Sequence, residues 1–119
     1  MHNYRNLKVW QRAVAFAIRI YRETEKFPTR EQFGLTSQIR RASVSIALNI
    51  AEGSGNNSHK EFARFLEISV RSDYEVATAI EIARGLKYWT DSLADELSKE
   101  TDEIIAMLVG LTRSLQQKQ

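Results

Sequence analysis

The chain has 119 residues, 43% of them hydrophobic and 27% charged, with a formal net charge of +2 and no cysteine. This length fits one domain with a single core, and the lack of cysteine excludes disulfide frameworks and thiolate metal sites. No apolar run approaches the ~18 residues of a membrane span, and the first ten residues lack the apolar segment of a signal peptide, so we expect one cytoplasmic domain over residues 1–119 with no membrane association.

Positive charge is concentrated in the first half of the chain. Residues 1–60 carry ten Lys or Arg and four Asp or Glu, whereas residues 61–119 carry seven and eleven, so the two halves have net charges of +6 and −4. A basic half can contact phosphate while the acidic half stays solvated. Alternatively, basic and acidic helices pair with each other inside one bundle. The sequence leaves both interpretations open.

The first predicted helix runs from Leu7 to about Lys26 and has a wide apolar face. Its basic residues fall within roughly 100° of the helix circumference, interrupted only by Glu23, and few acids stand four residues away to neutralise them. This stripe is the first candidate for phosphate contact, although a solvated face gives the same pattern. Its members in our nucleic-acid prediction are Arg5, Lys8, Arg12, Arg19 and Arg22.

The second predicted helix runs from Leu35 to Glu52, after the Phe27-Pro28 break. Arg40 and Arg41 lie beside its apolar stripe and join the nucleic-acid candidates. These two arginines can reach phosphate, a neighbouring subunit, or carboxylates on later helices, and the last two roles are structural. Gly53 and Gly55 follow, where a helix commonly ends on a residue in the left-handed conformation.

Two longer helices complete the predicted fold. Ser58 and Glu61 form a capping box that opens a third helix, whose near-continuous heptad extends from Phe62 to Leu86. One of the residues 90–92 caps the fourth helix, which keeps an apolar stripe as far as Leu115. Four amphipathic helices with short connections predict an all-α, antiparallel, up-down-up-down four-helix bundle.

Several polar residues lie on or beside the apolar stripes of the second and third helices. They form either a buried polar network that needs internal hydrogen bonds or, less conventionally, a carboxylate site built on Glu52 and Glu75. Beside Glu52 and Glu75, the set comprises Ser45, Asn49, Ser69 and Ser72.

The sequence offers little support for an enzyme. His2 and His59 lack the spacing of a di-metal bundle site, and there is no cysteine nucleophile, no G-x-S-x-G elbow and no P-loop. The GSGN segment after the second helix fits a helix end better than a phosphate loop. We therefore expect no catalytic residue, no metal and no cofactor.

A set of short motifs is similar to one known family. They are LKVWQ at 7–11, FP at 27–28, FGL at 33–35, QIRRA at 38–42, SI at 45–46, NIAEG at 49–53, EF at 61–62, RFL at 64–66, and single Ser72 and Glu75. Together they resemble the bacterial four-helix-bundle family named after the protein encoded in intervening sequences of 23S ribosomal RNA. NIAEG following QIRRA is the most specific combination, and the fourth helix agrees in pattern only.

The resemblance implies a four-helix bundle that assembles as a homopentameric ring. It also implies similarity to the accessory protein of diversity-generating retroelements, which partners a reverse transcriptase and binds nucleic acid through a basic surface. The matched family positions, which we expect to be structural, are Ser45, Asn49, Glu52, Gly53, Ser72 and Glu75.

Two functional hypotheses follow. The first is a non-enzymatic oligomeric bundle that binds structured RNA or DNA through the basic residues. The second is a scaffold or partner-binding ring, for example for a reverse transcriptase, with no nucleic-acid role. Surplus apolar residues outside the narrow stripes predict an interface in either case. These are Val9, Val44, Leu48, Ile68 and Ile82.

Overall fold

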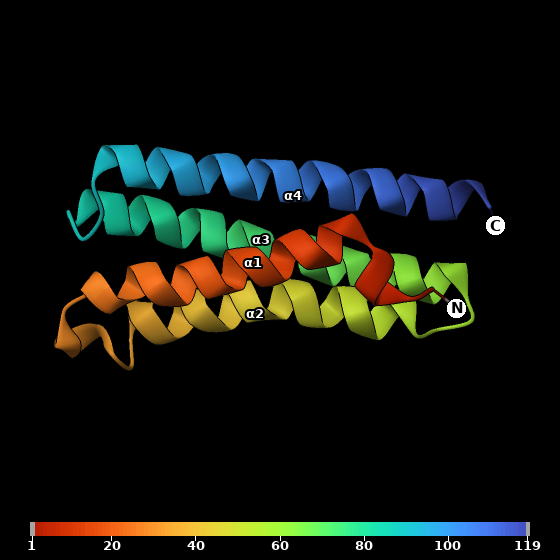
Figure 1. Ribbon diagram of the computed structural model, residues 1–119, viewed down its shortest axis with the longest axis horizontal. Coiled ribbons are helices and arrows are strands. Elements are labelled where there is room, and N and C mark those ends of the chain that lie inside the picture. Colours follow the sequence, from red (N-terminus) through yellow and green to blue (C-terminus); the bar gives the residue numbers. More distant parts are fainter. Residues whose placement is uncertain (1, 119) are drawn as a thin grey trace.

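Four long helices form the molecule in the computed structural model, which describes residues 2–118. They are α1 (Lys8–Glu23), α2 (Leu35–Ser54), α3 (His59–Gly85) and α4 (Asp91–Gln117), with single 3-10 turns at Tyr4–Asn6, Thr24–Lys26 and Thr29–Glu31. No strand occurs among these residues. The helices lie side by side along the longest axis of a body measuring 46 × 23 × 20 Å (Figure 1).

Short connections join the helices at alternate ends of the molecule (Figure 1), an arrangement compatible with the expected four-helix bundle. Contacts between α2 and α3 and between α3 and α4 are the most extensive, and α1 packs mainly on α2. None of the helices in the described range combines the length and the apolarity that crossing a membrane requires.

The helix starts follow local sequence signals. Ser58 Oγ accepts a hydrogen bond from the Glu61 backbone N–H at 3.2 Å, as the predicted cap of the third helix requires. Among residues 90–92, Thr90 is the cap of α4, because its Oγ1 accepts from the Leu93 N–H at 3.1 Å. The first helix ends at Glu23, earlier than expected, and the chain tightens into a 3-10 turn over Thr24–Lys26.

The two glycines after the second predicted helix do not act as left-handed caps. Gly53 lies inside α2, which continues to Ser54, and Gly55 has a right-handed φ of −77°. No described glycine has a positive φ, and within residues 2–118 the residue in the left-handed region is Lys87, in the α3–α4 connection. Gly53 is needed for space instead: a Cβ there would lie 2.6 Å from the Phe65 Cβ and 3.2 Å from the Phe62 carbonyl oxygen.

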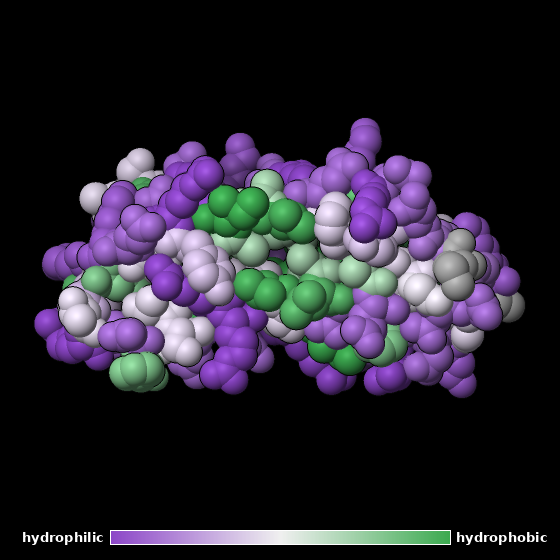
Figure 2. All heavy atoms as spheres, turned by 60° about the horizontal axis from the view of Figure 1, so that its bottom comes forward, coloured by the Kyte–Doolittle hydropathy of each residue, from purple (hydrophilic) through white to green (hydrophobic). Residues whose placement is uncertain are grey.

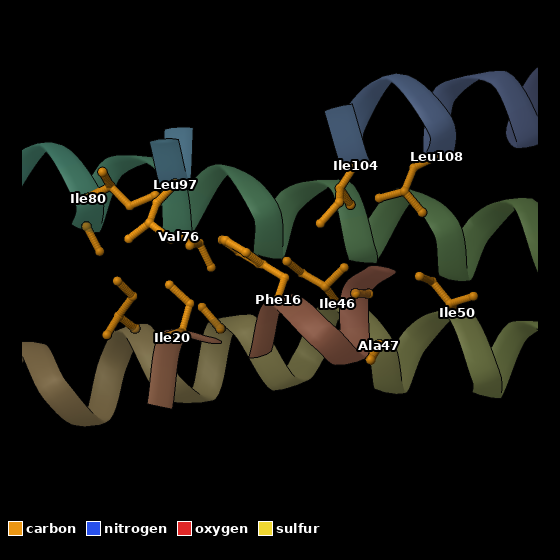
Figure 3. Close-up of a cluster of buried hydrophobic side chains, with 14 of the residues drawn as sticks. Phe16, Ile20, Ile46, Ala47, Ile50, Val76, Ile80, Leu97, Ile104 and Leu108 are labelled. Carbon is orange, nitrogen blue, oxygen red and sulfur yellow. The ribbon is translucent and has the colours of Figure 1, made fainter. Parts of the chain in front are cut away.

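Aliphatic and aromatic side chains from all four helices meet in the core (Figure 3). In this view Phe16 of α1 lies beside Ile46 of α2, whereas Ile20 of α1 lies toward Val76 of α3 and Leu97 of α4. The buried seam of α3 runs through positions 62, 66, 69, 73, 76, 80 and 83. Most positions of the expected heptad are buried as well, but Phe65 is only half-buried and Leu86 is exposed.

The end of the bundle that holds the first and third connections is fixed by aromatic residues. Trp89 is buried, and its indole N–H donates to the Glu23 carbonyl oxygen at 2.9 Å. Its ring packs against Phe27, with 4.9 Å between centroids. The Tyr88 hydroxyl donates to Glu31 Oε2 at 2.8 Å. These contacts hold the α1–α2 connection against the α3–α4 connection.

Candidate functional site

Arg12, in the middle of the predicted basic stripe, is bound to acidic residues of α4. Its guanidinium donates to both carboxylate oxygens of Glu100, at 3.1 and 2.6 Å, and also to Glu103. These hydrogen bonds, first to Glu100 and then to Glu103, raise the pKa of Arg12. The expectation that the stripe lacks neutralising partners is therefore wrong at this residue, whose partners lie on another helix.

Arg19 is neutralised in the same way. Its Nη2 donates to Glu96 of α4 and its Nε to Glu23 of α1, each at 3.0 Å. The hydrogen bonds to Glu96 and Glu23 raise the pKa of this arginine. Lys26 also contacts Glu23, at 2.9 Å, and this hydrogen bond contributes most to lowering the pKa of that carboxyl. Arg12 and Arg19 thus connect α1 to α4.

Four of the seven predicted nucleic-acid residues keep their charge available on the surface. Arg5, Lys8, Arg22 and Arg41 are exposed, and none of them forms an ion pair within residues 2–118. The Arg5 guanidinium lies over the Tyr4 ring, 4.8 Å from its centroid. The structure therefore divides the predicted stripe into residues that bind α4 and residues that face solvent.

Arg40 has a structural role that the sequence did not suggest. Its Nε donates to Thr24 Oγ1 at 2.8 Å, its Nη2 donates to the Tyr21 carbonyl oxygen at 3.2 Å, and the guanidinium lies over the Tyr21 ring. It therefore fixes the end of α1 to α2. None of the three roles weighed for this residue included hydrogen bonds to the first helix.

The small polar residues of α2 and α3 form hydrogen bonds between or within these helices. Ser45 Oγ and Ser72 Oγ share a hydrogen bond of 2.8 Å, and Asn49 Nδ2 donates to the Ser45 carbonyl oxygen and Oγ at 2.9 and 3.0 Å. The buried Ser69 hydroxyl donates to the Ile46 carbonyl oxygen at 2.9 Å. This arrangement matches the structural interpretation of a satisfied polar network.

Glu52 and Glu75 do not form a common site. Glu75 lines a groove with Arg41 of α2, eleven residues before Glu52 on the same helix. At 1.5 Å per residue, that separation is about 16 Å along α2. Both glutamates are exposed, and among the described residues no group of three or more His, Cys, Asp or Glu is arranged to hold a metal ion. A carboxylate site built on this pair is therefore excluded by geometry.

A large apolar groove lies between α1 and α2. Its volume is about 620 Å³, and apolar and aromatic side chains dominate its lining. Leu48 is the most exposed apolar residue of the groove, with 61% of its surface accessible. Figure 2 shows hydrophobic side chains gathered near the middle of this side of the molecule. The main apolar lining residues are Trp10, Val14, Ile18, Tyr21, Val44 and Leu48.

The apolar surface continues across α2 onto α3. Val44 and Leu48 also line a second groove, of about 600 Å³, whose other wall includes Ile68. Gln38 and Glu75 connect it to a third groove of about 380 Å³, where Tyr74 and Ile82 are exposed. We call these three adjoining grooves the α2 face. Of the five surplus apolar residues, Val9 is buried in the core, whereas the other four belong to this face.

Comparisons with known proteins place the chain in a family. A solved structure from the S23 ribosomal protein family of Bacteroides thetaiotaomicron, described as a protein with unknown function, superposes with a TM-score of 0.81. It is 24% identical, and the match covers 88% of this chain and 95% of that one, so the likeness supports the fold. No curated protein matches. The family model for the 23S rRNA-intervening sequence protein matches residues 5–110, and this chain therefore belongs to that family.

Proposed function

We propose that this chain is a non-enzymatic helical bundle that associates with copies of itself through the α2 face. The exposed apolar surface of three adjoining grooves around Leu48 is the observation that carries the proposal. Contiguous apolar patches of this kind on small proteins mark interaction sites, because leaving them in water is unfavourable. The charged partners of α1 lie on α4, so the α2 face is free to pack against another molecule.

We propose that the partner packed on the α2 face is a second copy of the chain. Repeated around a closed ring, this contact would give the homopentamer that the family resemblance implies. Most soluble oligomers consist of identical subunits in closed symmetry. Leu48 lines two adjoining grooves and is exposed between them. It therefore forms a ridge that can insert into a groove of the neighbouring copy.

Solution mass tests this proposal directly. We expect light scattering of the purified protein to give a mass near five chains, and Leu48→Glu to shift the peak toward the monomer, because a buried unpaired carboxylate is unfavourable at an interface. The matched control is Glu67→Gln, an exposed change on α3 outside the α2 face. A monomeric parent protein, or an unchanged mass for Leu48→Glu, would contradict the proposal.

Nucleic-acid binding is the activity that we propose for the assembly, in the cytoplasm. Arg5 and Lys8 are exposed and form no ion pair within residues 2–118, and repetition around a ring multiplies weak phosphate contacts. Arg12, Arg19 and Arg40 are removed from the proposed site because their guanidinium groups are engaged within the bundle. Binding of this kind is salt-dependent and largely independent of base sequence.

A charge-reversal pair separates this activity from a purely scaffolding role. We expect Arg5→Glu/Lys8→Glu to weaken binding to labelled structured RNA or duplex DNA at least tenfold in fluorescence anisotropy. The control, Lys87→Glu/Lys99→Glu, makes the same change in net charge at two exposed positions on the α3–α4 side and should have a much smaller effect. Equal affinities for the parent and both variants would favour the scaffold, for example for a reverse transcriptase.

A further inference from the structure

Asp73 is a carboxylate enclosed in the bundle core. Its relative exposure is 0%, and it lies on the buried seam of α3 between Ser69 and Val76. Neither carboxylate oxygen has a hydrogen-bond partner among the described residues. A charged carboxylate in such surroundings is very unfavourable, and an isolated one usually takes up a proton instead. Asp73 does not line any of the three grooves of the α2 face.

The helices around Asp73 provide no compensating positive charge. Asp102 and Glu100 of α4 act on it electrostatically, and both are acidic. Arg12 of α1 is bound to Glu100 and Glu103. The carboxylates of Asp102 and Glu100 therefore increase the cost of a negative charge on Asp73.

On α2, the residues level with Asp73 carry no charge. The Ser69–Ile46 and Ser45–Ser72 hydrogen bonds set the register of α2 against α3 and bring Ser43 to the level of Asp73. The buried Ser43 hydroxyl donates to the Arg40 carbonyl oxygen. The side of the site formed by α2 is therefore neutral.

We propose that Asp73 is a pH-sensitive switch in the core, uncharged while α3 and α4 are packed together and ionised when they separate. Burial, followed by the charges of Asp102 and Glu100, raises the pKa of Asp73 to about 8. In the unfolded chain an aspartate ionises near pH 3.9, so between these limits the folded state binds the additional proton. Stability therefore falls as pH rises, and this loss is complete above the folded-state pKa.

The test is urea unfolding of the full chain at one protein concentration across pH 5–9, comparing the parent with Asp73→Asn. The linkage of one proton changes the folding equilibrium constant by roughly tenfold per pH unit, so we expect a parental decrease approaching 100-fold between pH 5 and 7. Asp73→Asn has nearly the same shape and cannot ionise. We expect it to lose this decrease and to be more stable than the parent at pH 8.

Asp102→Asn is the matched control, because it removes an exposed aspartate from the facing helix. It should retain the pH dependence, with Asp73 ionising at a somewhat lower pH since one repulsive charge is gone. Carbon-13 NMR of labelled aspartate gives an independent measurement: we expect the Asp73 carboxyl to remain protonated at pH 6. An ionised Asp73 at pH 6, or the same pH dependence in Asp73→Asn as in the parent, would overturn the proposal.

Discussion

Gly53→Ala tests whether close packing between α2 and α3 is the reason for glycine at this position. In an ordinary helix interior, replacing glycine with alanine stabilises a protein by about 0.5–1 kcal/mol, because alanine loses less backbone entropy. At Gly53 the added methyl group would lie 2.6 Å from the Phe65 Cβ, 3.0 Å from Phe62 Cδ1 and 3.2 Å from the Phe62 carbonyl oxygen. The Phe65 Cβ and the Phe62 carbonyl oxygen are fixed to the α3 backbone, so they can move away only if α3 itself moves.

The steric term decides the sign of the effect. Forcing one methyl group into a packed core typically costs about 1–3 kcal/mol. Phe62 is fully buried, so its side chain has little room to move away. Subtracting the helix-propensity gain leaves about 0–2.5 kcal/mol. Because Phe62 is enclosed, we expect a net destabilisation in the upper part of this range, about 1–2 kcal/mol, measured as a lower urea midpoint with an unchanged slope.

Gly110→Ala is the matched control. Gly110 lies within α4, and a Cβ there would meet nothing within 4 Å. We expect this variant to be more stable than the parent by about 0.5–1 kcal/mol. The packing argument would be refuted if Gly53→Ala were stabilising by a similar amount.

Three further perturbations test the contacts that hold the bundle together. Ser45→Ala and Ser72→Ala should each cost about 1 kcal/mol, and the double mutant less than the sum of the two, because both remove the same hydroxyl pair. Trp89→Phe keeps an aromatic ring but leaves the part-buried Glu23 carbonyl oxygen without the indole N–H, so we expect a loss of about 1–2 kcal/mol by urea unfolding. Arg12→Ala should destabilise the bundle, and the effect should shrink as NaCl is added, because its partners are partly exposed; an effect independent of salt would contradict an electrostatic origin.

Local signals in the sequence were sufficient to predict the helices. The Ser58 cap depends on residues three positions apart, and the break at Phe27-Pro28 depends on adjacent ones, so both could be predicted without knowing the tertiary fold. Gly53 was expected to end the second helix in a left-handed conformation, but it lies inside α2, where glycine leaves space for α3. Its function depends on Phe62 and Phe65 of the following helix, whose approach the local pattern cannot give.

The missed carboxylate had a signal in the sequence. Spacing of three and four residues through Phe62, Leu66, Ser69, Val76 and Ile80 places position 73 on the same face. The expected heptad shared some of these positions but ran through Phe65, Ser72 and Leu86, so it did not include Asp73. Two overlapping apolar stripes on one helix cannot be ranked without the packing partners, which are supplied by α2 and α4.

The excess of basic residues in the first half of the chain is partly compensated by ion pairs between α1 and α4. Arg12 and Arg19 are bound to Glu96, Glu100 and Glu103, so the middle of the basic stripe is bound to the acidic face of α4 inside the molecule. This pairing moves the candidate functional surface to the opposite side, because ion pairs occupy the α1–α4 edge whereas Leu48 and its neighbours leave the α2 face apolar. A protein that used its whole basic stripe for nucleic acid would have to break these ion pairs, whereas self-association through α2 requires none of them to change.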